Sequence, residues 1–176
     1  MRLGKLLSYL KANGIVVATA ESCTAGLIAG RLADARGAGS SLEVGYVVYS
    51  AEAKCGCLGV DPKTIDRFGL TSEAVAREMA LGALRRSTAS IAVADTGLAE
   101  APPEGSEVPP GTVCFAWAVR TDHGDPIVHT ETRRFDGSRN VVRRTAADYA
   151  LDRIPHCWER VRASAVLPEP AATAKR

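Results

Sequence analysis

The chain has no large excess of charge, few aromatic residues and no long apolar run. Its 22 Lys and Arg nearly balance 20 Asp and Glu, giving a formal net charge of +2, and aromatic residues make up 5%. A nucleic-acid-binding protein needs a basic stripe with interleaved aromatic residues, which this sequence lacks. No stretch could span a bilayer, and the amphipathic N-terminus, MRLGKLLSYLKANG, lacks the apolar core of a signal peptide. We therefore expect a cytoplasmic protein that binds neither nucleic acid nor membrane.

The cysteines and histidines are also too scattered along the sequence to form a disulfide framework or a zinc site. The five cysteines are odd in number, which argues against a disulfide framework. Cys55 and Cys57 form a C-x-C pair, but no second pair or nearby histidine completes a zinc site. We expect no metal and no cofactor.

What the sequence does have is an alternation of apolar β-branched runs and helix-like segments. The apolar runs predict strands over 15–20, 43–50, 89–97, 111–121 and 126–136. Helical spacing and capping signals predict helices over 3–13, 24–35, 51–59, 61–69, 71–86 and from 138 onward, with Pro155 kinking or dividing the last. This order predicts an α/β domain with helices on both faces of a mostly parallel sheet, one antiparallel strand and a late hairpin. We expect one domain over 1–162 and a disordered tail over 163–176.

Ligands of such sheets bind where the parallel strands end. Three segments follow predicted parallel strands: 20–24, 49–54 and the loop after Asp95. We call the place where they meet the carboxyl edge. The next segment to the C-terminal side, 98–110, is rich in proline and is predicted to be a loop, and long loops are often functional.

Ser22 and Lys54 are candidate reactive residues at the carboxyl edge. Ser22 precedes a predicted helix, whose free backbone N–H groups stabilise negative charge, although Ser22 or Thr24 can equally be an ordinary N-cap. Partial burial would lower the pKa of Lys54 enough for it to act as a base, and serine activated by lysine is a known form of nucleophilic catalysis. Tyr49 would relay a proton or hold the lysine. The alternative is that Lys54 is a surface charge and Tyr49 a core residue.

Three other candidates remain open at the carboxyl edge. Cys23 is intrinsically more nucleophilic than a serine, but no histidine falls nearby to activate it. Ser50 lies one helical turn before the lysine and is a second candidate nucleophile. Glu21 and Asp95 both end predicted strands, so they form a possible acid–base pair, and Glu21 is otherwise expected to orient the loop or a substrate donor.

A basic cluster spans the end of the last predicted strand and the start of the last predicted helix. Its members are Arg133, Arg134, Arg139, Arg143 and Arg144. An arginine at a helix start can bind a phosphate together with free backbone N–H groups, and Arg139 is nearest to the turn. The alternative is a solvated helix face.

Taken together, these segments resemble the CinA C-terminal domain family, whose best-understood members are nicotinamide-nucleotide amidases. The matching segments are ATAESCTAG (18–26), VVYSAEAK (47–54), LGV (58–60), TSEAVAREMALGAL (71–84), IAVADTG (91–97), GTV (111–113) and RRFDGSRNVVR (133–143). The resemblance implies a three-layer α/β/α sandwich and a metal-independent serine amidohydrolase that releases ammonia from nicotinamide mononucleotide in pyridine nucleotide recycling. It implies Ser22 as the nucleophile, Lys54 as its base and Tyr49 as the third member.

We expect the substrate to contact residues of the same segments. They are Glu21, Cys23, Thr24, Ala25, Gly26, Thr96, Gly97 and Arg139. Two features depart from the family pattern. Ala25 stands where the family usually has glycine, and LAEAPPEG (98–105), with Glu100 and Glu104, replaces an Ile-Ala-Gly-Pro run followed by glycines.

A second interpretation is a catalytically silent or substrate-shifted relative that binds a nucleotide or a protein partner. A homodimer is the expected assembly if the chain associates with itself. Phe115 and Trp117 on the late hairpin suit either a self-association surface or the core.

Overall fold

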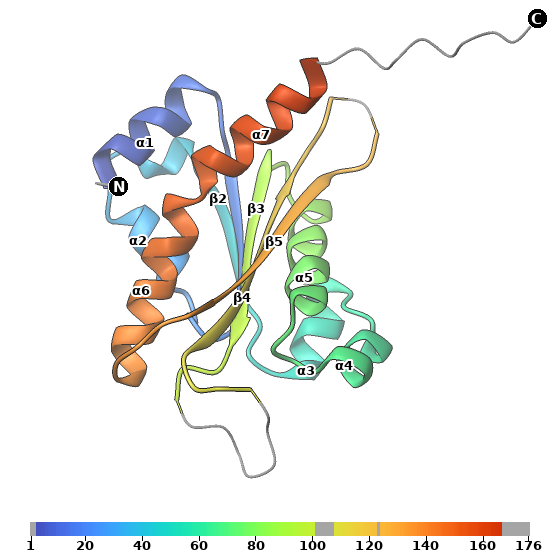
Figure 1. Cartoon of the computed structure of the whole chain (residues 1–176). Coiled ribbons are helices and arrows are strands. Elements are labelled where there is room, and N and C mark those ends of the chain that lie inside the picture. The colour runs from blue at the N-terminus through green and yellow to red at the C-terminus, as the bar shows by residue number, and fades with distance from the viewer. Residues whose placement is uncertain (1–2, 101–107, 123, 167–176) are drawn as a thin grey trace, which may run out of the picture.

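The computed structural model describes residues 3–100, 108–122 and 124–166. Within these ranges one five-stranded sheet runs in the order β2-β1-β3-β4-β5 (Figure 1). The strands are β1 (Val17–Glu21), β2 (Leu42–Val47), β3 (Ile91–Gly97), β4 (Thr112–Val119) and β5 (Ile127–Arg134). β1 pairs in parallel with β2 and β3, whereas β4 is antiparallel to both β3 and β5. The single antiparallel strand and the late hairpin are therefore confirmed, although only half of the pairings are parallel.

Helices cover both faces of the sheet (Figure 1). One face carries α1 (Leu3–Ala12), α2 (Leu27–Ala33), α6 (Arg139–Asp152) and α7 (Ile154–Val166). The other carries α3 (Ala51–Ala53), the π-helical turn η2 (Lys54–Leu58), α4 (Pro62–Phe68) and α5 (Glu73–Arg85). A short 3-10 turn, η1 (Ala38–Ser40), precedes β2. The two faces bury separate apolar clusters, which confirms the predicted α/β/α sandwich.

Some boundaries differ from the prediction for identifiable reasons. α2 begins at Leu27 rather than near Thr24, because Ala25 and Gly26 have φ angles of 51° and 91°, outside the helical region. The chain from 51 to 58 is a short α-turn followed by a π-turn. Pro155 divides the last helix as predicted, at the second residue of α7. α7 continues to Val166, into the segment expected as a tail, whose residues from 167 lie outside the described ranges.

Phe115 and Trp117 belong to the core. Both side chains are fully buried on the face covered by α6 and α7, and Trp117 Nε1 donates to the carbonyl oxygen of Ala150 at 2.9 Å. The interpretation of these two residues as a self-association surface is therefore wrong. No helix in the described part of the chain is both long and apolar enough to cross a membrane.

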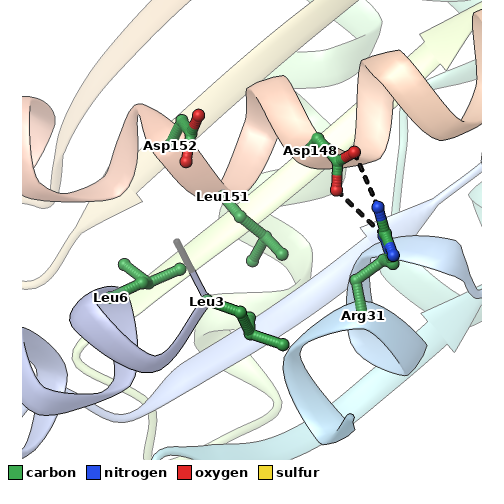
Figure 2. Close-up of a pocket in the computed structure, with 6 residues that line it drawn as sticks. All are labelled: Leu3, Leu6, Arg31, Asp148, Leu151 and Asp152. Carbon is green, nitrogen blue, oxygen red and sulfur yellow. Dashed lines mark hydrogen bonds and ion pairs between the residues drawn. The ribbon is translucent and has the colours of Figure 1, made fainter. Parts of the chain in front are cut away.

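A cavity of about 300 Å³ lies between α1, α2 and α6 (Figure 2). Its lining residues are Leu3, Leu6, Arg31, Asp148, Leu151 and Asp152. Arg31 donates two hydrogen bonds to Asp148, at 2.9 and 2.8 Å, across its mouth (Figure 2). Both side chains of this ion pair are about half exposed, so the pair contributes less than about 1 kcal/mol. None of the lining residues lies at the carboxyl edge.

Gly82 of α5 is predicted to be intolerant of a side chain. A Cβ at this position would lie 2.2 Å from the carbonyl oxygen of Leu58, the last residue of η2. Gly82→Ala is therefore expected to lower the free energy of unfolding by about 1–3 kcal/mol in urea titrations, because η2 or α5 must move. Gly30→Ala is the control, since its Cβ meets nothing within 4 Å and should stabilise α2 by about 0.5–1 kcal/mol. Equal changes in the free energy of unfolding for the two variants would contradict the close packing of Gly82 against Leu58.

Candidate active site

The three segments predicted to meet at the carboxyl edge do meet there. Glu21 at the end of β1 is in register with Val47 of β2 and with Asp95 of β3. Beyond β1 the backbone N–H of Ser22 donates to the Asp95 carbonyl oxygen at 3.2 Å. Lys54, from the turn that follows β2, reaches the same point with its side chain.

Ser22 and Lys54 form a buried hydrogen-bonded pair. Lys54 Nζ lies 2.9 Å from Ser22 Oγ, 3.1 Å from the carbonyl oxygen of Val48 and 3.2 Å from that of Tyr49. The lysine is 1% exposed and the serine 7%. A neutral amine has two N–H donors and one lone pair. With its two N–H groups held by the carbonyls, a neutral Lys54 would direct its lone pair at the serine hydroxyl.

The surroundings favour the neutral form of Lys54. Burial lowers the pKa of its amine from the ordinary value, because a buried ammonium loses its hydration. The nearby Asp95 opposes this change but does not reverse it. A lysine with a lowered pKa, in contact with a hydroxyl, is suited to accept its proton.

Glu21 is occupied by the protein itself. Its carboxylate accepts from the backbone N–H groups of Gly26, Ile28 and Ala29 at 2.8–2.9 Å and from the hydroxyls of Thr19 and Thr24 at 2.9 and 2.8 Å. The side chain is fully buried. The carboxylate thus satisfies the first N–H groups of α2, which the sequence had left open to a negative charge or to a serine or threonine cap.

Cys23 and Thr24 bind the second buried carboxylate. Cys23 Sγ donates to Asp95 Oδ2 at 2.9 Å, and the Thr24 N–H donates to the same oxygen at 3.3 Å. Burial and the neighbouring carboxylate raise the pKa of the Cys23 thiol far above its ordinary value. Since the thiolate is the nucleophilic form, Cys23 is poorly suited to attack a substrate.

The turn between Thr24 and α2 is unusual in its backbone. Ala25 is the one described non-glycine residue with a positive φ, and it occupies a position where the resemblance predicted glycine. An alanine in this conformation carries a steric cost that glycine does not. The departure from the family pattern at Ala25 therefore affects the strain of the backbone.

Tyr49 and Arg139 contact each other at the protein surface. Arg139 Nη2 donates to the Tyr49 hydroxyl at 2.9 Å, and Arg139 Nη1 is 2.6 Å from Glu100 Oε1. Tyr49 is 58% exposed, and it is the Tyr49 carbonyl rather than the hydroxyl that contacts Lys54. Glu104 lies outside the described residues.

The remaining predicted residues have partners within the protein. Thr96 Oγ1 donates to the Leu70 carbonyl oxygen at 2.8 Å, and a Cβ on Gly97 would lie 2.5 Å from the Thr112 carbonyl oxygen. Ser50 Oγ accepts from the Ala53 N–H at 3.1 Å, so it caps α3.

Arg143 has a role that sequence reasoning did not assign. Its Nε and Nη2 donate to the carbonyl oxygens of Cys23 and Thr24 at 2.8 and 2.9 Å. The arginine thus clamps the turn that carries Ser22. Its spacing of one helical turn after Arg139 was visible in the sequence, but backbone partners from a distant segment leave no sequence signal. Among the described residues, no group of three or more metal-ligating side chains gathers.

Comparison with known proteins places this chain in a family. A sequence model of the CinA C-terminal domain matches residues 3–158. The chain belongs to the CinA C-terminal domain family. It is 43% identical over 151 residues to the nicotinamide-nucleotide amidohydrolase PncC of Escherichia coli strain K12, with 86% of this chain and 87% of that protein covered. It is 41% identical over 149 residues to a CinA-like protein of Chlorobium limicola, with 85% of this chain but only 34% of that longer protein covered.

Solved structures of the family share the fold. A CinA superfamily protein from Escherichia coli is 33% identical, with a TM-score of 0.79, covering 88% of this chain and 87% of that one. A competence/damage-inducible protein from Agrobacterium tumefaciens is 36% identical, with a TM-score of 0.77, covering 88% and 94%.

Proposed function

We propose that this chain is an amidohydrolase that converts nicotinamide mononucleotide to nicotinic acid mononucleotide and ammonia, using Ser22 as nucleophile and Lys54 as base. The observation that carries the proposal is the buried contact of 2.9 Å between Lys54 Nζ and Ser22 Oγ. The similarity to a nicotinamide-nucleotide amidohydrolase over most of both chains supports the substrate.

The geometry of the Ser22–Lys54 pair supports the following reaction. Neutral Lys54 accepts the Ser22 proton while Ser22 Oγ attacks the carboxamide carbon, forming a tetrahedral intermediate. The Lys54 ammonium formed in this step then donates its proton to the amide nitrogen. The C–N bond breaks, ammonia departs, and the acyl group remains on Ser22. Water, deprotonated by the same lysine, then releases the acid.

The developing oxyanion needs N–H donors in the Ser22 turn. The N–H groups of Thr24 and Gly26 already bind carboxylates. This leaves the N–H groups of Cys23 and Ala25 as the donors that we assign to the oxyanion.

The exposed arginine is the proposed phosphate contact. Arg139 donates to the hydroxyl of Tyr49, whose backbone carbonyl contacts Lys54. In this role Tyr49 orients the arginine and closes one side of the substrate site. Glu100 competes with the phosphate for Arg139, and this contact favours the second candidate function, a substrate-shifted relative.

Glu100→Ala is therefore expected to lower the KM for nicotinamide mononucleotide. A surface ion pair is worth up to about 1 kcal/mol, so the change should be about two- to fivefold. The KM for nicotinamide riboside, which lacks the phosphate, serves as the control and should not change. An equal decrease for both substrates would show that Arg139 is not the phosphate contact.

The proposal is tested by ammonia release from nicotinamide mononucleotide. Ser22→Ala should reduce turnover by at least about 10³-fold, since loss of a catalytic serine removes the acyl-enzyme route. Ser50→Ala, which removes only the cap of α3, should retain turnover within a few-fold. Full turnover in Ser22→Ala, or none in the folded wild type, would refute the proposed function.

A further inference from the structure

A second buried carboxylate lies beside the Ser22–Lys54 pair and has no role in the reaction proposed above. Asp95 is fully buried at the end of β3. It accepts from Cys23 Sγ at 2.9 Å and from the Thr24 N–H at 3.3 Å, both through Oδ2, and its Oδ1 contacts Thr24 Oγ1. These contacts fix the two residues that directly follow Ser22.

The single hydroxyl proton of Thr24 cannot serve both carboxylates that the hydroxyl contacts, those of Glu21 and Asp95. Thr24 Oγ1 contacts Glu21 Oε2 at 2.8 Å and also contacts Asp95 Oδ1. A hydroxyl has one proton to donate, so two ionised acceptors cannot both be satisfied. Glu21 accepts four further hydrogen bonds and is the better stabilised anion. Of the two carboxylates, Asp95 is therefore the one that takes up a proton more readily, and it can then donate that proton to Thr24.

The charges around Asp95 agree with this assignment. Burial is the largest cause that raises its pKa, to about 6, and the Glu21 carboxylate acts in the same direction. The groups that face Asp95 are Glu21 from β1, the Cys23 thiol and Lys54 from η2, while Arg143 from α6 holds the Cys23 carbonyl. An ionised Asp95 raises the pKa of Lys54 and favours its ammonium form.

We propose that Asp95 is a positioning residue that holds Cys23 and Thr24 beneath the reacting pair and, through its own protonation, sets the pH range in which Lys54 is a neutral base. An ionised Asp95 raises the pKa of Lys54, so that the neutral base forms at a higher pH than it would beside an uncharged side chain. The lysine still loses its proton below its ordinary range, because burial outweighs the carboxylate. The catalytic part of this inference rests on the proposed function, whereas the coupling between the two side chains does not.

Asp95→Asn is the variant that matches the protonated acid. Its amide oxygen can replace Oδ2 as the acceptor for Cys23 and Thr24, and its NH₂ can replace the protonated Oδ1 as the donor to Thr24 Oγ1. The substitution removes the charge and keeps the shape. Cys23→Ala is the matched control, because it breaks the contact with Asp95 at 2.9 Å and leaves the carboxylate in place.

The test is a direct titration of Lys54 by NMR with ¹³C-labelled lysine. The chain has five lysines, and Lys54→Arg identifies the signal. In Asp95→Asn the pKa of Lys54 should fall by about one unit, whereas in Cys23→Ala it should change by no more than a few tenths. An unchanged pKa in Asp95→Asn, or the same change in both variants, would overturn the proposal. If Asp95→Asn does not fold, Asp95→Ser supplies the neutral side chain.

A substrate-independent activity measurement separates the two proposals. Phenylmethanesulfonyl fluoride reacts with an activated serine, with loss of fluoride, whatever the natural substrate is. The pH at which labelling of Ser22 is half-maximal should fall by about one unit in Asp95→Asn. Labelling with this shift but without ammonia release would refute the proposed substrate alone. Labelling of Ser22 with no shift in its pH dependence would refute the role of Asp95 alone. If Ser22 is not labelled at all, the NMR titration of Lys54 tests the role of Asp95.

Discussion

Replacing Lys54 by methionine or by arginine should reduce turnover of nicotinamide mononucleotide by roughly 10³-fold or more. Methionine keeps a side chain of similar length but lacks the amine that would act as the base. Arginine keeps the positive charge but holds its proton at any working pH, so it cannot act as a base. If Lys54 served only as a fixed charge beside Ser22, arginine would restore a large part of the activity. Recovery in Lys54→Arg would therefore contradict the role as a base.

The pH dependence of the wild type supplies the companion measurement. Since the folded-state pKa of Lys54 is lower than its ordinary value of 10.5, activity should rise with pH and level off below pH 10.5. Stability changes in the same direction. Between the lowered and the ordinary pKa the unfolded chain binds more protons, so the free energy of unfolding of the wild type rises with pH. Lys54→Met has no lysine to titrate here and lacks this pH dependence. The free energy of unfolding of Lys54→Met minus that of the wild type should therefore be larger at pH 6 than at pH 9.

Glu21→Gln is expected to lower the free energy of unfolding by about 2–4 kcal/mol. The carboxylate accepts five hydrogen bonds in a fully buried site. The NH₂ of glutamine would face N–H and hydroxyl donors, and the start of α2 would lose its charged partner. For a chain of this length, a loss of about 3 kcal/mol corresponds to a fall in Tm of about 6–12 °C.

Glu43→Gln is the matched control for this prediction. Glu43 also accepts two hydrogen bonds, from the N–H and the hydroxyl of Thr88 at 2.9 Å, but it is exposed. Its substitution should cost less than about 1 kcal/mol in the same urea titration. Similar losses for the two variants would mean that Glu21 has no special part in holding α2.

The sequence was informative wherever short-range signals decide the structure. Apolar runs and caps predicted every strand and most helices, and the rule that parallel strands end together predicted that Ser22, Lys54 and Asp95 would be neighbours. The helix predicted over 71–86 is α5, which Ser72 caps by accepting from the Val75 N–H at 3.3 Å.

The rest depended on partners that no local pattern records. Glu21 had been expected to orient the loop or a substrate donor, and its carboxylate binds the start of α2, because a buried carboxylate is most stable where several N–H groups converge. Whether Tyr49 directs its hydroxyl or its carbonyl toward Lys54 depends on the turn after β2, which the sequence does not specify. The contacts of Arg143 join segments 120 and 119 residues apart.

The clamp made by Arg143 also has a consequence for the order in which the protein matures on the ribosome. The residues that we assign to the chemistry lie within the first 54, but the side chain that secures their turn is not made until residue 143. Chains fold as they emerge, and contacts between distant segments close last. A nascent chain that ends before α6 thus lacks one of the contacts that hold the Ser22 turn, and the full set is present only when nearly the whole domain has been synthesised.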